Sequence, residues 1–264
     1  MSDGTSGARP RLTRHEFVSG LHRVLQPRTY LEIGVENGFG LELSRARTIG
    51  IDPDFHITRE VKAPLELARV TSDEFFARDD PLGFFEGTPI DLAFVDGMHL
   101  IEYAYRDLMN IEEFSAPATV VVFDDVLPRS VEEAARQRHT DAWTGDVFKL
   151  VGILRRHRPD LALLLVDTQP TGSLVVLGLD ASSTVLADAY DGVIEGAVTD
   201  DPQDVPADLL ARREALDPLD LLWWPGWHDL VRARGSAAAQ PHAVADRVRA
   251  DFPASLPERP AQRR

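Results

Sequence analysis

Acidic side chains end four of the predicted strands. They are Glu32, Asp52, Asp96 and the pair Asp124-Asp125. Ligands of open α/β sheets bind at the carboxyl ends of the strands, and carboxylates that converge there repel each other unless a cation lies nearby. The pattern therefore predicts a cleft that holds positive charge and hydroxyl donors. A divalent metal ion and a positively charged cofactor with a ribose would satisfy both requirements.

A glycine-rich turn follows the first of these strands. Gly34, Gly38 and Gly40 have the spacing G-x-x-x-G-x-G, whereas dinucleotide-binding turns have G-x-G-x-x-G. Glu32 and Glu36 would also repel a phosphate group. Glycine lets a strand bend sharply into a helix and lets a ligand approach bare backbone. Such a turn alone is equally compatible with packing and with ligand binding, so the other motifs must decide.

Composition narrows the class of protein. The 264 residues are 44% hydrophobic and 27% charged, as in soluble globular proteins. The chain has no cysteine, which excludes disulfides and thiolate chemistry and leaves oxygen or histidine as metal ligands. The net charge of −15 disfavours nucleic acid and anionic membranes as partners. No apolar run is long enough to cross a bilayer, and the polar N-terminus lacks a signal-peptide core, so we expect a cytoplasmic protein.

Predicted strands and helices alternate up to about residue 180. The strands are 29–33, 48–54, 67–70, 90–95, 118–123, 161–166 and 173–177, and the helices are 13–26, 71–76, 100–114, 131–138, 147–156 and 181–196. This alternation predicts a doubly wound α/β fold with a mostly parallel seven-stranded sheet. The turn 170–172 is too short for a crossover helix, so the last strand should be antiparallel.

Four segments are expected along the chain. They are a disordered leader (1–12), the α/β domain (13–180), a helical, tryptophan-rich C-terminal extension (181–234) and a flexible tail (235–264). Trp223, Trp224 and Trp227 are too apolar to leave in water. We expect them to pack the extension onto the domain or onto a second copy of the chain, which leaves a homodimer open. The alternative is an aromatic wall or lid over a substrate.

Residues 15–180 resemble the class I S-adenosylmethionine-dependent methyltransferases, which have a Rossmann-like fold. The run Glu32–Gly38 is similar to the first motif of that family. The resemblance implies that Glu32, Gly34 and Gly38 surround the methionine part of the cofactor. It further implies that Asp52 holds the ribose hydroxyls and that Ser72 and Asp73 lie beside the adenine.

Three later runs resemble a narrower group, the bacterial macrolide-sugar O-methyltransferases and the catechol O-methyltransferases. They are Phe94–His99, Val122–Asp125 and Trp143–Lys149. The resemblance implies a magnesium ion held by Asp96, Asp124 and Asp125, with Asp96 also next to the cofactor. Catechol-type enzymes have a general-base lysine three positions after the first metal ligand, and this chain has His99 there. With a usual pKa of about 6.5, His99 could take the proton of the acceptor, and Asp96 is the other candidate.

We therefore expect an S-adenosylmethionine-dependent O-methyltransferase, assisted by Mg²⁺, that acts on a hydroxyl of a small metabolite or glycoside. Each aspartate could instead cap a turn or helix, and His99 could make a structural hydrogen bond. Two rival hypotheses remain: a methyltransferase that needs no metal, and a cofactor-binding protein without activity. An oxidoreductase is disfavoured by the glycine spacing and by Glu32.

Overall fold

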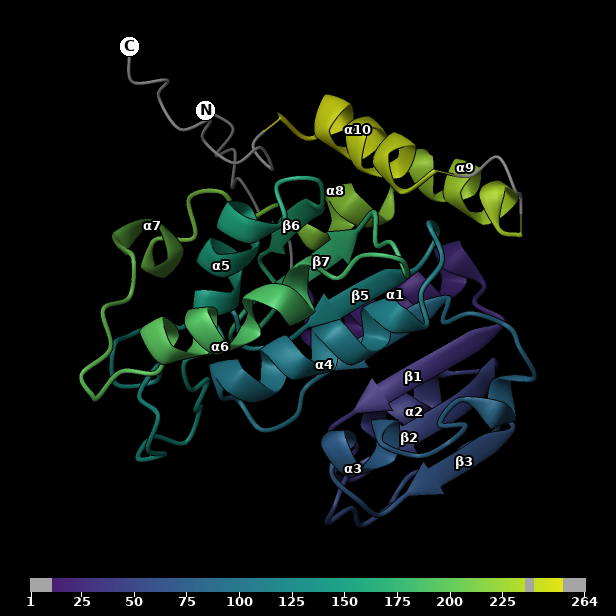
Figure 1. Cartoon of the computed structure of the whole chain (residues 1–264), viewed down its shortest axis with the longest axis horizontal. Coiled ribbons are helices and arrows are strands. Elements are labelled where there is room, and N and C mark those ends of the chain that lie inside the picture. The colour runs from purple at the N-terminus through teal and green to yellow at the C-terminus, as the bar shows by residue number, and fades with distance from the viewer. Residues whose placement is uncertain (1–10, 236–239, 254–264) are drawn as a thin grey trace, which may run out of the picture.

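The computed structural model describes residues 11–235 and 240–253 and has a seven-stranded sheet at its centre (Figure 1). The strands are β1 (Thr29–Ile33), β2 (Arg47–Ile51), β3 (Leu65–Ala68), β4 (Leu92–Val95), β5 (Val120–Phe123), β6 (Ala162–Val166) and β7 (Ser173–Leu177). Every residue of β1 and of β4 to β7 is buried. This burial on both faces explains why β4, β5 and β6 are continuous apolar runs rather than alternating ones.

The strand order is β3-β2-β1-β4-β5-β7-β6. All neighbours are parallel except that β7 runs antiparallel to β5 and β6. The predicted doubly wound sheet with an antiparallel last strand is therefore confirmed. Ile33 pairs with Ile51 and with Val95, and Val95 pairs with Phe123. This register brings the residues that follow β1, β2, β4 and β5 to one edge of the sheet.

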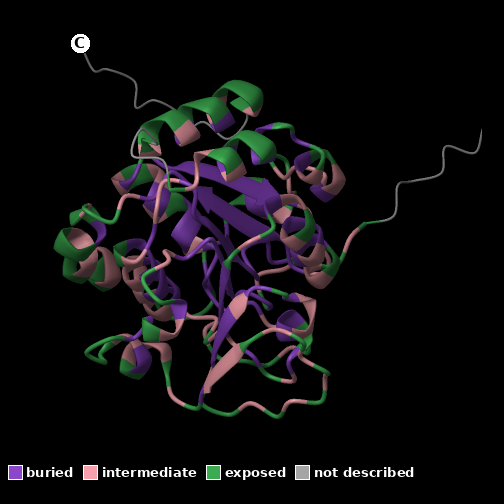
Figure 2. Ribbon diagram, turned by 90° about the vertical axis from the view of Figure 1, so that its right-hand side faces the viewer, coloured by how far each residue is buried: buried purple, intermediate pink, exposed green. Residues whose placement is uncertain are grey.

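Helices cover both faces of the sheet (Figure 2). The core on one face includes residues of α3 (Ser72–Phe76), α4 (Ile101–Glu113), α5 (Lys149–His157), α6 (Val185–Ala197) and α7 (Ala207–Leu210). The core on the other face includes residues of α1 (Arg14–Leu25), α8 (Pro218–Leu222), α9 (Gly226–Ala233) and α10 (Pro241–Asp251). The short helix α2 (Phe39–Leu43) follows the glycine turn, and a 3-10 turn covers Gly83–Phe85.

Most predicted helices are confirmed with small shifts at their ends, but the helix predicted over 131–138 is wrong. That segment forms turns. The carbonyl of Glu133 accepts hydrogen bonds from the backbone and hydroxyl of Thr144, and the carbonyl of Ala135 accepts one from the Trp143 indole. Because these two carbonyls accept hydrogen bonds from a neighbouring loop, they are not available for the backbone hydrogen bonds of a helix.

The tryptophan-rich part of the C-terminal extension, α8 and α9, packs on α1. Trp224 and Trp227 are 7% and 2% exposed, and their rings meet edge to face at 5.0 Å. Neither lines the cavity described below, so the alternative of an aromatic lid is wrong for them. Trp223 is 82% exposed. The predicted flexible tail must also be corrected for residues 241–251, which form α10: its Ala245 and Val248 are buried, because they pack against the sheet.

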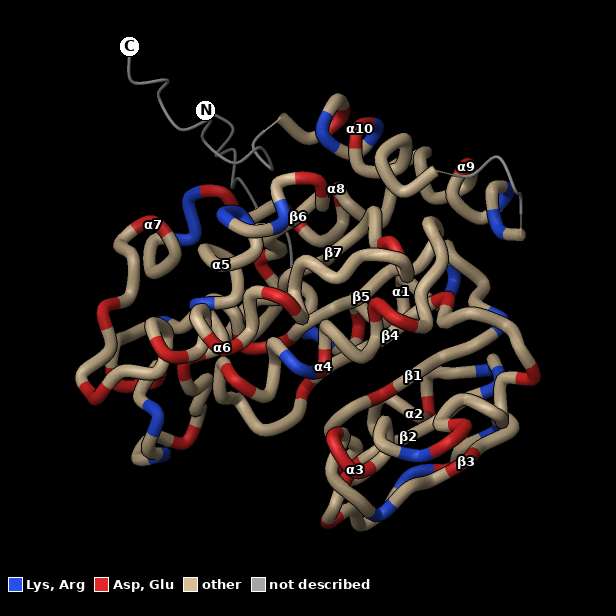
Figure 3. Tube along the Cα trace, viewed as in Figure 1, with Lys and Arg blue, Asp and Glu red and all other residues tan. Residues whose placement is uncertain are grey.

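The predicted leader and the ends of the tail, residues 1–10, 236–239 and 254–264, lie outside the described residues. Within the described ranges, no helix is both long and apolar enough to span a bilayer. Lysine and arginine residues are scattered among acidic ones in Figure 3, and many of them form ion pairs with acids close by, such as Arg47 with Glu86 and Arg155 with Glu214.

Candidate active site

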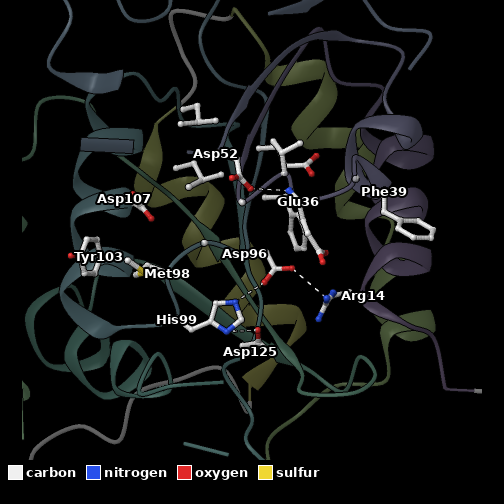
Figure 4. A pocket seen from close by; sticks show the side chains of 18 of the residues that line it. Arg14, Glu36, Phe39, Asp52, Asp96, Met98, His99, Tyr103, Asp107 and Asp125 are labelled. Atoms are coloured by element: carbon white, nitrogen blue, oxygen red, sulfur yellow. Dashed lines mark hydrogen bonds and ion pairs between the residues drawn. The ribbon is translucent and has the colours of Figure 1, made fainter. Parts of the chain in front are cut away.

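A cavity of about 720 Å³ lies at the carboxyl ends of β1, β2, β4 and β5 (Figure 4). Its wall is completed by the first turn of α1, the N-terminal part of α4 and the loop around Trp143. Seven of the predicted site residues line it: Glu32, Gly34, Asp52, Ser72, Asp96, His99 and Asp125. Gly38, Asp73 and Asp124 are not part of its lining. The sheet edge thus gathers most of the predicted set around one space.

The glycine turn brings the ends of β1 and β4 into contact. Gly34 has φ +88°, and a Cβ atom there would lie 1.9 Å from the carbonyl oxygen of Asp96. Only glycine allows this approach. Gly38, with φ +86°, starts α2. Gly40 is also constrained, because a Cβ atom there would lie 2.4 Å from the Glu32 carboxylate.

Glu32 lies under the turn and is 2% exposed. The Tyr30 hydroxyl donates a hydrogen bond of 2.8 Å to its Oε2 atom. Burial raises the pKa of Glu32 to about 8, although the hydrogen bond from Tyr30 acts in the opposite direction. A cationic ligand beside Glu32 would favour the charged carboxylate and lower this pKa.

Asp52 projects from the end of β2 toward the turn (Figure 4). Its Oδ2 atom accepts a hydrogen bond of 2.8 Å from the backbone N–H of Glu36, and its Oδ1 atom accepts one of 2.7 Å from Asp54. The side chain is therefore fixed at the cavity wall. Each carboxylate oxygen has a second lone pair, which remains able to accept a bond from a ligand hydroxyl.

Ser72 and Asp73, the two residues predicted to lie beside the adenine, have side chains that face different surroundings in the structure. Ser72 lines the cavity, whereas the Asp73 carboxylate faces Arg106 and receives bonds of 2.9 Å and 2.8 Å from its Nε and Nη2 atoms. In place of Asp73, Asp107 of α4 lines the cavity, and only 2% of it is exposed. Asp107 is not among the site residues predicted from the sequence. The available signal was an acid on the apolar face of the helix, three residues after Ala104 and four before Ile111.

Asp96, His99 and Asp125 form a cluster at the other end of the cavity. His99 Nε2 lies 3.2 Å from Asp96 Oδ1, and His99 Nδ1 lies 3.2 Å from Asp125 Oδ2 and 2.9 Å from the Trp143 carbonyl. One potential ligand atom from each of the three residues lies within 4.8 Å of the others. The Trp143 ring stacks on His99 at 5.1 Å.

Asp124 points away from this cluster. Its Oδ2 atom forms an ion pair of 2.8 Å with Arg14, and its Oδ1 atom accepts a hydrogen bond from Ser173. Arg14 also lies 3.5 Å from Asp96 (Figure 4). Arg14 is likewise not among the site residues predicted from the sequence. An arginine in the first turn of a helix, where the dipole disfavours a cation, was the signal that could have identified it.

Arg14 and His99 therefore offset the negative charge of the aspartates in and beside this cluster. Burial would lower the pKa of His99, but the hydrogen bond to Asp96 and the charge of Asp125 raise it to about 9. Burial would raise the pKa of Asp96, yet His99 and Arg14 hold it below the usual value. Burial and the neighbouring Asp125 charge raise the pKa of Asp124 well above its usual value.

Trp143, in the loop after the turns 131–138, and Lys149, the first residue of α5, have different roles. Trp143 lines the cavity. Lys149 instead donates a hydrogen bond of 3.0 Å to the buried Asp146, whose other carboxylate oxygen accepts one from the first N–H of α4. Gly145 lies so close to His99 that a Cβ atom would be 1.7 Å from its carbonyl. This loop thus holds His99 in place.

Comparison with known families agrees with this geometry. Residues 31–126, from β1 to just past β5, match the model of a family described as a methyltransferase domain. This part of the chain is therefore similar to a methyltransferase domain. The matched residues include the glycine turn, Asp52, Asp96 and Asp125. The family match and the strand order together confirm the class that the motifs resemble.

Solved structures give more distant likenesses. One is the O-methyltransferase TomG from Streptomyces achromogenes, described as involved in tomaymycin synthesis and in complex with S-adenosylmethionine. It has 20% identity and a TM-score of 0.46, and the match covers 62% of this chain and 78% of that one. An O-methyltransferase from Bacillus cereus in complex with S-adenosylhomocysteine has 15% identity and a TM-score of 0.43, covering 62% and 80%. No curated protein sequence matches the chain. These likenesses are too distant to carry a functional conclusion.

Proposed function

We propose that this methyltransferase transfers the methyl group of S-adenosylmethionine to a hydroxyl oxygen of a small molecule. The observation that carries the proposal is one continuous cavity that joins Asp52 to the Asp96–His99–Asp125 cluster. The cofactor occupies the β1–β2 end, with Asp52 accepting bonds from the ribose hydroxyls. Glu32 faces the positively charged end of the cofactor, and the acceptor hydroxyl binds at the cluster.

Methyl transfer in this site is an in-line displacement at carbon. The acceptor oxygen attacks the methyl carbon, the carbon–sulfur bond breaks, and the electron pair of that bond stays on sulfur to give a neutral thioether. The protein contributes mainly by positioning the two reactants against each other in the cavity. The methyl group passes between the two ends of the cavity, next to Gly34 and Asp96, where β1 and β4 touch.

The cluster is suited to a divalent cation. Two carboxylates and one imidazole can turn their ligand atoms toward a common point, and carboxylate oxygens are the preferred ligands of Mg²⁺. The imidazole also favours a transition ion such as Mn²⁺. When bound, such a cation would lower the pKa of the acceptor hydroxyl. Asp96, His99 and Asp125 would hold it, whereas Asp124 would act through Arg14. An acceptor with two adjacent hydroxyls, a catechol or a sugar diol, would suit such a site.

A specific observation favours a second candidate, transfer without any metal. Arg14 and His99 already neutralise the aspartates. In this version His99 takes the acceptor proton and Asp96 orients its ring. Because the pKa of His99 is raised to about 9, the ring is mostly protonated at neutral pH, so the rate should increase with pH up to about pH 9. A rate that is constant between pH 7 and 9 would place the base elsewhere.

The test uses S-adenosylmethionine with a labelled methyl group, with catechol and a methyl glycoside as acceptor probes. After treatment with a chelator, the protein should lose methyl transfer and regain it with Mn²⁺ or Mg²⁺. Asp125→Asn should abolish the recovery, while the matched variant Asp124→Asn should retain most of it. Transfer that is indifferent to the chelator and to Asp125→Asn supports the metal-free version. Absence of transfer together with absence of cofactor binding would overturn both.

A further inference from the structure

We propose that Asp107 reads the 6-amino group of the cofactor's adenine, so that this acid of α4 replaces Asp73 as the residue that selects the base. The inference rests on the proposed position of the cofactor in the cavity. The resemblance to known methyltransferases pointed to Ser72 and Asp73 instead. In the structure only Ser72 of that pair lines the cavity, and the carboxylate that lines it beside Ser72 is that of Asp107.

Among the described residues, Asp107 lacks a hydrogen-bond donor for one of its carboxylate oxygens. It is 2% exposed and lines the cavity. The Ser72 side chain hydrogen-bonds to its carboxyl group. Among the described residues no group hydrogen-bonds to its Oδ1 atom, which is itself buried. A buried carboxylate oxygen without a donor is costly, so a ligand N–H that reaches it adds affinity.

Asp73 is already satisfied by the protein. Arg106 donates to both of its carboxylate oxygens, at 2.9 Å and 2.8 Å, and its Nη1 atom also donates to the Tyr190 hydroxyl at 2.6 Å. The Asp73 side chain is 41% exposed and is not part of the cavity wall. Recruiting it to the ligand would break this bidentate pair, whereas Asp107 needs no rearrangement.

The surroundings of Asp107 suit a purine. Ile51, Pro53 and Met98 also line the cavity and offer apolar surface to the faces of a flat ring. Asp52 fixes the position of the ribose, and the base must continue from the ribose along the wall toward Ser72 and Asp107. In Figure 4 the Asp107 carboxylate lies on the side of Tyr103 and Met98, apart from the Asp96–His99–Asp125 cluster.

Burial raises the pKa of Asp107 to about 7, with a smaller contribution from the charge of Asp73, while Ser72 and Arg106 act in the opposite direction. An amino group of the ligand would stabilise the ionised carboxylate and offset this shift. A base with a carbonyl oxygen at the same position would instead place two acceptors against each other. Asp107 should therefore discriminate strongly between adenine and hypoxanthine.

The experiment compares S-adenosylhomocysteine with S-inosylhomocysteine, in which a carbonyl oxygen replaces the 6-amino group. Calorimetry on the full chain needs no methyl acceptor. The wild-type protein should bind the adenine compound at least about tenfold more tightly, because a bond to a charged acceptor is replaced by repulsion. Asp107→Asn keeps the shape but supplies both an acceptor and a donor, so the two compounds should bind within about threefold of each other. Asp73→Asn is the matched control and should keep the wild-type preference.

Each outcome is decisive. If Asp107→Asn keeps the full preference, or if Asp73→Asn loses it, the assignment to Asp107 is wrong. If the wild-type protein binds neither compound, the proposed cofactor site fails, and the inference fails with it. Thermal melting of each variant shows whether it is folded, and Asp107→Ser provides a second, smaller substitution in case the amide disturbs α4.

Discussion

The two ends of the cavity differ in how their acidic side chains are paired. At the β1–β2 end the buried acids form no ion pair with a described residue, whereas at the β4–β5 end the aspartates are paired with Arg14 and His99. Glu32 and Asp107 are buried and, within the described part of the chain, form no ion pair. Burial raises their pKa values to about 8 and about 7. Asp96, Asp124 and Asp125 instead face Arg14 and His99. Acids without an ion-pair partner suit the first end to a ligand that brings positive charge and donors, as we propose for the cofactor. At the second end, any metal ion must compete with cations of the chain itself.

The largest expected effect is at the contact that joins the two ends. Gly34→Ala should destabilise the fold by about 3 kcal/mol or more, because the new methyl group would overlap the Asp96 carbonyl and φ is positive. Denaturation in urea measures this change. Gly87→Ala is the matched control: it also has a positive φ, +76°, but open space around it, and should cost about 1 kcal/mol. Equal costs would show that the close approach at Gly34 is unimportant.

The next largest effect is expected on cofactor binding at the β1–β2 end of the cavity. Asp52→Ala should weaken binding of S-adenosylhomocysteine about 100-fold, since it removes the proposed bonds to two ribose hydroxyls. Isothermal titration calorimetry gives the affinity. Asp54→Ala, at a fully exposed neighbouring acid, should bind as the wild-type protein does. If Asp52→Ala also keeps its affinity, the ribose is held elsewhere.

Glu32 should make cofactor binding depend on pH. A cationic ligand binds the ionised carboxylate, and the raised pKa of about 8 means that the ligand-free protein must first lose a proton below that pH. Affinity for S-adenosylmethionine should therefore rise with pH between 6 and 7.5, by up to about tenfold per unit. Glu32→Gln should flatten this dependence. If the affinity of the variant changes with pH as steeply as that of the wild-type protein, another group causes the pH dependence, and Asp107 is the first candidate.

The smallest expected effect is at the second end. Arg14→Leu removes one of the cations that compete with a metal ion, so Mn²⁺ should bind about fivefold more tightly, which corresponds to about 1 kcal/mol. Electron paramagnetic resonance of free Mn²⁺ measures the binding. Arg11→Leu, which removes an exposed arginine paired with Asp167, is the control. Weaker binding in Arg14→Leu would mean that Arg14 orients Asp96 for the ion instead of competing with it.

Local sequence patterns were sufficient for much of the fold. The apolar runs, the glycine turn and the acids after β1, β2, β4 and β5 predicted the seven strands and the antiparallel β7, because strand periodicity and short turns are local properties. The helix predicted over 131–138 failed for a non-local reason: Thr144 and Trp143 bind the carbonyls of Glu133 and Ala135. No pattern within the segment reveals that competition.

The sequence by itself determined the class of the domain and the types of residue at the sheet edge, since both follow from the alternation of strands and helices along the chain and from motifs within single turns. The tertiary structure decided which acids face the cavity. Asp73 and Asp107 are both aspartates in the sequence. In the structure Arg106 pairs with Asp73, whereas Asp107 lies at the cavity wall. Asp124 and Asp125 are adjacent in the chain, yet Arg14 pairs with Asp124, and Asp125 joins Asp96 and His99. Burial and pairing depend on neighbours far apart in the sequence, so only the folded chain can assign these roles.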